Sequence, residues 1–403
     1  MAFLLSSQNV SQYLLDMNLC TQQDLESIQI ETLPPAKNFN LLIKLPNERK
    51  FLVKQECHAF NGRVANELIN EWKFYQLQQH LDIFNSLKPS VIPVVNFDEA
   101  NSIIIYEYLD KYSDLIKVYH QEKVFPSAIA ASVGKILATL HRTTFNQPDC
   151  QDFLAKFSEE KIHFEFSNPA KNLEKGISRI SPEIFGMVPP ECLKFFILYQ
   201  RYNSLAEAVT ELKDAWHPCC LTHNDLKLNN ILIDRDGERQ LRLPKASLSE
   251  ELDAGMMRLI DWERCAWGDP AFDLGTIIAS YLQIWLSSLV VASSIQIEES
   301  LRLAETPLEL LQSSILALTK AYLRNFPMIL EYRPDFLKRV IQFAGLGLIH
   351  QIESIMQYQK LFGNTGICML QVAKTLLCRP EESIYTVFGT VESDLTSPKP
   401  VAF

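Results

Sequence analysis

The spacing of apolar residues changes once along this chain, and that change restricts its fold more than any other feature. Before about residue 110, two segments, NFNLLIKLPNERKFLVKQE and VIPVVNFDEANSIIIYEYLD, each hold two apolar runs around a turn signal. Such segments predict β-hairpins. Farther on, apolar residues recur at helical spacing, and the region from 272 to about 378 is almost entirely helical in pattern. The sequence therefore predicts an α+β chain with a small antiparallel sheet followed by a large helical region.

The same patterns divide the 403 residues into four parts. We expect a helical extension over 1–30, a sheet with one helix over 31–109, a helical region over 110–390 and a flexible tail over 391–403. A chain of this length usually exceeds one small domain, so two lobes are expected. Within the helical region, one helix is expected to begin at Pro126-Ser127, and one long helix is expected over 189–216.

Composition excludes some classes of protein. The formal net charge of −10 argues against binding to a nucleic-acid backbone. The nine cysteines are scattered without metal-ligand spacing, which favours a reducing, cytoplasmic location. The stretch 274–297 carries no charge and is long enough to span a bilayer, but its serines and glutamines favour a buried helix. We expect no membrane association.

A polar cluster lies in the segment LTHNDLKLNNILID, over residues 221–234, directly before an apolar run. Asp225 and Asn230 are five residues apart, and Asp261 follows in LIDWERCAWGDPAFDLG. A carboxylate in such a loop can orient an attacking hydroxyl and accept its proton. An amide oxygen and a second carboxylate are the oxygen ligands that Mg²⁺ prefers. The three residues together indicate transfer of a phosphoryl group.

The first part of the chain contains candidates for a nucleotide site. Lys54 ends the strand-like run FLVK, where its ammonium could reach phosphates. Glu71 on the following helix is expected to hold that lysine, with Glu67 one turn earlier as the alternative. The run IIIYEYL enters the boundary between the two parts. Its backbone could bind the edge of an adenine at Glu107, Tyr108 and Leu109.

The motifs HNDLKLNNILID and LIDWERCAWGDPAFDLG resemble the aminoglycoside phosphotransferase and choline kinase-like family. The resemblance covers about residues 35–300 and implies a bilobal protein kinase-like fold that uses ATP and Mg²⁺. It implies that Asp225 is the catalytic base and that Asn230 and Asp261 bind the metal. Asp273 would brace the catalytic loop.

The resemblance also implies lesser roles for two histidines. His223 would be structural within the catalytic loop, and His141, in LATLH, would be a packing residue. Typical protein kinases have an activation loop and an APE motif after the metal-binding aspartate. The dozen residues between Asp261 and Asp273 leave no room for them.

Two features depart from the family pattern. The segment LPPAKNFNLLIKL, where a phosphate-covering loop is expected, has no glycine. The backbone of 36–39 would then cover the phosphates, together with Lys37. The second departure is Lys227, two residues after Asp225, because a lysine there is typical of protein Ser/Thr kinases, in which it meets the transferring phosphate. We therefore count Lys227 among the catalytic candidates.

The sequence predicts a kinase that phosphorylates a hydroxyl group. It leaves open which molecule carries that hydroxyl. The acceptor is a choline-like or sugar-like metabolite, or a Ser/Thr side chain of a peptide. The peptide alternative resembles kinases of ribosomally made, lanthipeptide-type peptides, whose partner lyase then eliminates the phosphate. An aminoglycoside acceptor is a lesser alternative, because IEESLRLAE is the only acidic cluster after residue 274. A nucleotide-binding pseudokinase or scaffold is the alternative from another class.

Overall fold

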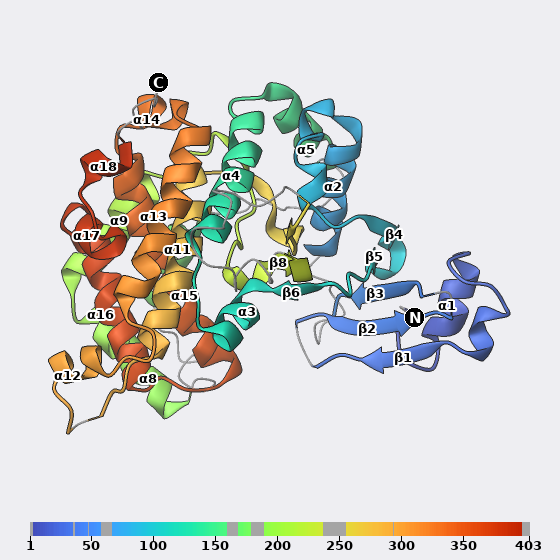
Figure 1. The fold of residues 1–403 in the computed structure, drawn as a ribbon, viewed down its shortest axis with the longest axis horizontal. Helices are drawn as coiled ribbons and strands as arrows, with labels where there is room; N and C mark the ends of the chain where they lie inside the picture. Colours follow the sequence, from blue (N-terminus) through green and yellow to red (C-terminus); the bar gives the residue numbers. More distant parts are fainter. Residues whose placement is uncertain are drawn as a thin grey trace.

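The structure is a computed structural model, and it describes residues 3–34, 37–46, 48–57, 67–158, 168–178, 189–236, 255–292 and 294–396. Its N-terminal part is a five-stranded antiparallel sheet in the order β1-β2-β3-β5-β4, seen on the right of Figure 1. The strands are β1 (Gln29–Thr32), β2 (Phe39–Lys44), β3 (Lys50–Gln55), β4 (Val94–Asp98) and β5 (Ile103–Glu107). Both predicted hairpins are confirmed, since β2 pairs with β3 and β4 pairs with β5.

Side chains alternate between the two faces of this sheet, as the pleat requires. In β3, Phe51 and Val53 contribute to an apolar cluster with the N-terminal extension. Leu52 and Lys54 point to the other face, where helix α2 (Glu67–His80) lies and a cavity opens. The alternation therefore fixes Lys54 on the side of the sheet that faces the helical region.

The N-terminal extension covers the outer face of the sheet through α1 (Val10–Asp16), where Val10 and Leu14 are buried. Buried Gln55 attaches the chain before α1, because its side chain accepts from the backbone of Leu5 and donates to that of Phe3. Thr21 and Asp24 form a capping box, in which each side chain accepts the backbone N–H of the other residue, and a 3₁₀ turn, Asp24–Glu26, follows it.

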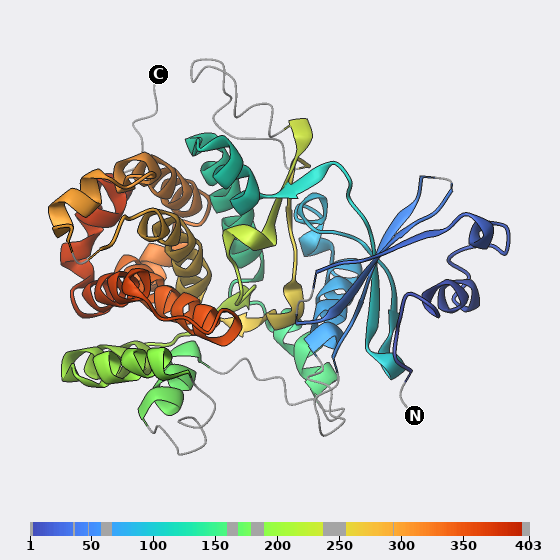
Figure 2. The ribbon, with the colours of Figure 1, turned by 90° about the horizontal axis from the view of Figure 1, so that it is seen from below.

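Helices make up most of the chain after β5, and Figures 1 and 2 show them packed into one body beside the sheet. The earlier ones are α3 (Leu115–Glu122), α4 (Ser127–Thr144), α5 (Pro148–Ser158), α6 (Pro169–Ser178), α8 (Pro190–Gln200) and α9 (Asn203–Asp214). The later ones are α11 (Pro270–Ser287), α12 (Ile297–Arg302), α13 (Leu308–Asn325), α14 (Met328–Tyr332), α15 (Phe336–Tyr358), α16 (Asn364–Cys378), α17 (Pro380–Phe388) and α18 (Glu392–Thr396).

Two small sheets lie between the large sheet and the helices. Strand β7 (Cys220–Thr222) pairs with β10 (Ala266–Gly268), and β8 (Ile231–Asp234) lies between β6 (Tyr112–Asp114) and β9 (Met257–Leu259). A Cβ atom on Gly268 would lie 2.1 Å from the Thr222 hydroxyl, so this close strand pairing requires glycine. These strands carry the loops that hold the candidate site.

Three sequence predictions need correction. The long helix expected over 189–216 is two helices, because the chain leaves the helix between α8 and α9 at Arg201 and Tyr202. The uncharged stretch 274–297 is helical only to Ser287, the end of α11. Residues 392–396 of the expected tail form α18, which buries Leu395 against the helical core, whereas 397–403 lie outside the described residues.

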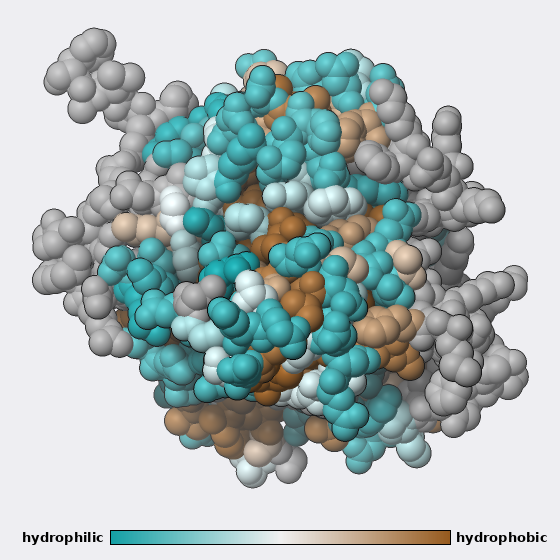
Figure 3. Space-filling view, turned by 90° about the vertical axis from the view of Figure 1, so that its right-hand side faces the viewer, coloured by the Kyte–Doolittle hydropathy of each residue, from teal (hydrophilic) through white to brown (hydrophobic). Residues whose placement is uncertain are grey.

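Within the described part of the chain, no helix is both long and apolar enough to cross a membrane. Most residues of α11 are buried, so its low charge reflects its place in the core. The face on the right-hand side of Figure 1 mixes hydrophilic and hydrophobic residues, with a hydrophobic strip near its middle (Figure 3). All nine cysteines are free thiols. The expected cytoplasmic location stays a prediction.

Candidate active site

The loop between β7 and β8 is held by a buried carboxylate from α11. The two oxygens of Asp273 accept the backbone N–H groups of His223, at 2.7 Å, and Asn224, at 2.8 Å. His141, on α4, lies 3.2 Å from the same carboxylate through Nε2 and 2.9 Å from the Tyr322 hydroxyl through Nδ1. His141 is therefore more than a packing residue, because it connects α4 and α13 to the support of the loop.

The loop brings together the three polar residues that the motif predicted. Asp225 Oδ2 accepts from Lys227 Nζ at 3.0 Å and from Asn230 Nδ2 at 3.2 Å. Asn230 Nδ2 also donates to the Asp225 carbonyl at 2.8 Å, which closes the turn. The His223 ring is fixed by contact with the Ile260 carbonyl at 2.8 Å. These contacts hold the Asp225 carboxylate at one position beside the lysine.

The second predicted carboxylate, Asp261, follows β9 and has a left-handed backbone with φ +70°. This conformation is strained for a residue with a side chain and is typical of functional turns. Lys54 Nζ lies 3.0 Å from Asp261 Oδ1. The lysine charge lowers the pKa of Asp261 to about 2, so the carboxylate is ionised throughout the physiological range.

Lys54 is paired differently from the expectation. Its ion pair is with Asp261, whereas Glu71 lines the same cavity and forms no ion pair with Lys54 in the described part of the chain. Burial alone would lower the pKa of Lys54, but Asp261 and, to a lesser degree, Glu71 raise it. Burial raises the pKa of Glu71, and Lys54 opposes that shift. Glu67, the alternative partner, pairs with Lys37 instead.

Lys37 also contacts the loop that follows β9. Its Nζ lies 2.9 Å from Oε1 of the buried Glu263, two residues after Asp261. Asn38 Nδ2 lies 3.5 Å from the other oxygen of Glu263, and Asn70 on α2 donates to the Glu263 carbonyl at 3.1 Å. Glu263 therefore joins the start of β2, helix α2 and the Asp261 loop. Ala36, part of the expected phosphate cover, lies outside the described residues.

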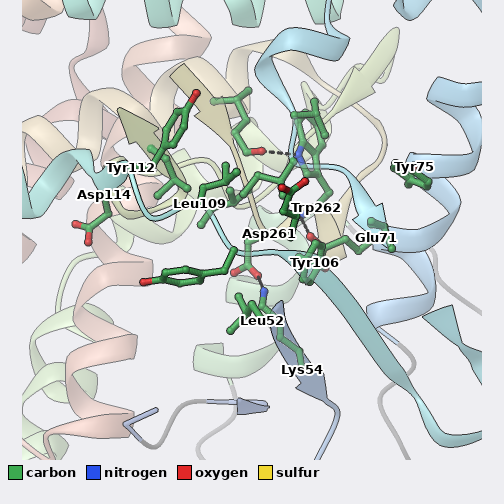
Figure 4. A pocket seen from close by; sticks show the side chains of 18 of the residues that line it. Leu52, Lys54, Glu71, Tyr75, Tyr106, Leu109, Tyr112, Asp114, Asp261 and Trp262 are labelled. Carbon is green, nitrogen blue, oxygen red and sulfur yellow. Dashed lines mark hydrogen bonds and ion pairs between the residues drawn. The ribbon is translucent and has the colours of Figure 1, made fainter. Parts of the chain in front are cut away.

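A cavity of about 300 Å³ opens between the sheet and the helical region (Figure 4). Lys54 and Asp261 meet within it, Glu71 enters from α2, and the backbone from β5 to β6 borders it. Its remaining walls are mainly apolar, and they include Leu52, Phe74, Val91, Ile92, Val94, Leu232, Leu259 and Trp262. An apolar slot that ends in a lysine and a carboxylate suits a nucleotide base and its phosphates.

The predicted adenine-binding residues Glu107, Tyr108 and Leu109 line this cavity. The Tyr108 N–H donates to the Lys50 carbonyl at 2.8 Å, so it is not available to a ligand. The Leu109 N–H donates to no atom of the described residues, while its carbonyl accepts from Tyr112 at 3.0 Å. Leu109 is therefore the residue of this segment whose N–H is best placed to bind a base edge.

A second cavity, of about 450 Å³, lies on the other side of Asp261. Asp261 lines both cavities, and Asp225 and Lys227 line the second. Helices α11 and α15 form its far wall with Phe272, Thr276, Gly347, His350, Gln351, Glu353, Ser354, Gln357 and Tyr358. Its volume falls within the range of small-molecule sites. The predicted base and metal ligand thus lie where the two cavities meet.

Two side-chain oxygens in this region are suited to coordinate Mg²⁺. Asp261 is ionised and uses one oxygen for Lys54, which leaves the other for a metal. Asn230 donates through its nitrogen to Asp225, and its Oδ1 accepts from no donor among the described residues. Mg²⁺ in kinases is usually held by one or two such protein oxygens together with phosphate oxygens and water. The donor set thus matches the metal that the sequence predicted.

Three further residues of the site were not expected from the sequence: Glu263, Arg264 and Glu353. Glu263 and Arg264 directly follow Asp261-Trp262, so closeness to a predicted metal ligand was a usable signal. Glu353 lies far along the chain from these residues, on a helix whose apolar periodicity indicates only the face that is buried. Nothing local in the sequence marks Glu353 as part of a site.

No protein-family model matches the chain, and no curated protein matches it. Among solved structures, the ethanolamine kinase of Plasmodium vivax aligns with a TM-score of 0.54 at 14% identity, over 94% of this chain and 91% of that one. A choline/ethanolamine kinase family protein of Mesorhizobium loti gives 0.47 at 15% identity, over 94% and 99%. Macrolide 2'-phosphotransferase of Brachybacterium faecium gives 0.45 at 14% identity, over 93% and 99%. The chain therefore has the bilobal protein kinase-like fold that the motifs implied, with a small antiparallel sheet and a large helical part.

Proposed function

We propose that this protein is an ATP- and Mg²⁺-dependent phosphotransferase that moves the γ-phosphate to an acceptor hydroxyl. The observation that carries the proposal is the position of Asp261 between two cavities. One cavity contains Lys54 and the β5–β6 backbone, and the other contains Asp225. A donor and an acceptor bound on the two sides of Asp261 would meet beside Asp225.

Each residue of the site has a role in an in-line transfer. The acceptor oxygen forms a bond to the γ-phosphorus while the bond from that phosphorus to the β–γ bridging oxygen breaks, and ADP leaves. Asp225 orients the hydroxyl and takes its proton, while Lys54 and Lys227 offset charge on the phosphates and the transferring group. Mg²⁺, when held by Asn230 and Asp261, supplies further neutralisation of that charge.

The second cavity favours a small-molecule acceptor, choline-like or sugar-like, because its volume and mixed polar and aromatic lining suit one. A fold shared with an ethanolamine kinase is in keeping with such an alcohol. Helix α12, which carries Glu298 and Glu299 of the only acidic cluster, contributes none of the described residues that line this cavity. That position argues against the aminoglycoside alternative.

A peptide serine or threonine is the second candidate acceptor, since Lys227 lies 3.0 Å from Asp225, as expected for a peptide kinase. A partner lyase would then eliminate the phosphate. Lys227→Ala separates the two candidates. With a peptide acceptor it should lower kcat far more than it weakens ATP binding, because the contact forms mainly in the transition state. Full-rate phosphorylation of a metabolite by Lys227→Ala, with no peptide modified, would contradict the peptide alternative.

The test of the proposal is direct. The purified chain is incubated with Mg·ATP and pools of choline-like, sugar-like, amino-acid and Ser/Thr-peptide acceptors, and mass spectrometry looks for the gain of one phosphoryl group. We expect a product with one acceptor class and none with Asp225→Asn. Nucleotide binding without transfer to any acceptor would instead support the pseudokinase alternative.

A further inference from the structure

The charged side chains of the second cavity divide into two groups. Most of them are neutralised in pairs within the site. Lys37 pairs with Glu263, Lys227 pairs with Asp225, and Asp261 pairs with Lys54. Of the charged residues that line this cavity, Arg264 and Glu353 remain, and they do not form an ion pair with each other. These two charges are therefore the ones that a ligand in the cavity could neutralise.

Glu353 lies on α15, one turn after His350, and both side chains line the cavity. Among the described residues, none donates a hydrogen bond to the Glu353 carboxylate or forms an ion pair with it. Burial raises its pKa to about 7, because no nearby charge compensates the ionised form. Removing an ionised carboxylate from water costs free energy unless a cation or a hydrogen-bond donor pairs with it. A bound ammonium group would supply the missing partner.

Arg264 is an exposed residue that ends the 3₁₀ turn Trp262–Arg264, and its backbone is held in place because its carbonyl accepts from the Asn224 side chain at 3.0 Å. Its guanidinium has no carboxylate partner among the described residues. It acts on the cavity nevertheless: burial and, to a lesser degree, the Arg264 charge lower the pKa of His350 to about 4, against an opposing effect of Asp225. His350 is therefore neutral, and Arg264 is the remaining cation that a carboxylate could meet.

We propose that Arg264 and Glu353 bind the carboxylate and the ammonium of a zwitterionic acceptor, so that the substrate is a free hydroxy amino acid. This inference rests on the proposed phosphotransferase function and names its acceptor class. The substrate hydroxyl would lie at Asp225, which takes the proton, and the products would be an O-phosphoamino acid and ADP.

The alternatives fit the charges less well. A choline-like acceptor would pair with Glu353 but bring a cation into a cavity that already holds Arg264. A neutral sugar would leave the half-buried Glu353 without a counter-charge. An internal residue of a peptide has neither free end. A free amino acid satisfies both groups and has no net charge, as the pair Arg264 and Glu353 has none.

The experiment measures kcat/KM with Mg·ATP for free hydroxy amino acids, for their blocked forms and for three other alcohols. The probes are L-serine, L-threonine and L-homoserine, the N-acetyl and carboxamide forms of each, and ethanolamine, choline and glucose. We expect the best free amino acid to exceed each blocked form, and every other probe, by about tenfold or more, because each of these probes lacks at least one charged end. Equal or faster transfer to choline, ethanolamine, glucose or a blocked form would overturn the inference and leave the phosphotransferase function standing.

Two variants locate the contacts. Glu353→Gln should lose the preference for the free over the N-acetyl form, and Arg264→Gln should lose the preference for the free acid over the carboxamide. In both, the acceptor KM should rise while the KM for ATP stays unchanged. Arg379→Gln and Glu382→Gln are the matched controls, because these residues form an exposed pair on α17 and its N-terminal flank. A variant that changes all probes alike would contradict its assigned contact.

A binding measurement separates failure of the inference from failure of the proposed function. L-norvaline and L-2-aminobutyrate lack the hydroxyl but keep both charged ends. Calorimetry should detect their binding to the wild-type chain and about tenfold weaker binding to Glu353→Gln and Arg264→Gln. Binding without any phosphoryl transfer would refute the function and keep the site. Transfer to some acceptor without this binding would refute the site and keep the function.

Discussion

The charge of Glu353 should destabilise the folded protein at high pH, and this can be measured apart from any activity. Its pKa is about 7 in the folded chain against an ordinary value of 4.5. Glu353 therefore binds its proton more tightly in the folded state than in the unfolded state. The free energy of unfolding then falls as the pH rises from about 4.5 through 7. The difference between these two pKa values corresponds to at most about 3 kcal/mol of the free energy of unfolding.

Glu353→Gln keeps the shape of the side chain and removes the charge. We expect it to raise the free energy of unfolding by up to about 3 kcal/mol at pH 8.5 and to change it little at pH 4.5. Urea titrations of wild type and variant at the two pH values measure the difference. The control is Glu382→Gln, because Glu382 is exposed and paired with Arg379. The same change at both pH values, or destabilisation at pH 8.5, would show that Glu353 is not the unpaired carboxylate described above.

Three further outcomes follow from the geometry. Asp225→Asn should keep nucleotide binding but lower kcat by about 10²- to 10⁴-fold, and retention of most of the rate in steady-state kinetics would remove it as the base. Asp261→Ala should abolish Mg²⁺-dependent ATP binding while Asn230→Ala weakens it less, since a carboxylate carries more of the metal's charge than an amide; calorimetry that shows unchanged affinity for Asp261→Ala would contradict the metal site. Gly134→Ala should destabilise the fold by about 1–3 kcal/mol, because the added Cβ would lie 2.2 Å from the Leu318 carbonyl oxygen; an unchanged thermal midpoint would mean that α4 and α13 separate easily.

The sequence was sufficient for features whose cause is local. Both hairpins follow from alternating apolar runs around turn residues, and α4 begins at Ser127, beside the proline that was expected to mark its start. The polar loop of the candidate site was found because its polar residues lie close together in the chain. Spacing also placed Asp225 and Asn230 together, as the structure has them. Features of this kind depend on neighbours in the chain and can be predicted from one sequence.

Pairings between distant elements could not be predicted in the same way. The sequence expected Glu71 or Glu67 to hold Lys54, yet Asp261, 207 positions away in the chain, forms the ion pair with it. Glu67 forms an ion pair with Lys37 instead, and Lys37 lies just before β2. Which carboxylate meets which lysine depends on how the sheet, α2 and the β9 loop pack. That packing is set by buried contacts rather than by local periodicity.

The ion pairs around Asp261 also bear on how a chain without a glycine-rich loop could cover phosphates. Glycine serves such loops by letting the backbone approach the phosphates closely. Here the start of β2 is fixed instead by side chains, since Lys37 contacts Glu263 and Glu67, and Asn38 contacts Glu263. These contacts order the segment against the Asp261 loop, but they also commit the Lys37 charge to carboxylates. With its ammonium between Glu67 and Glu263, Lys37 is placed to position this segment, and its expected role as a phosphate ligand stays a prediction.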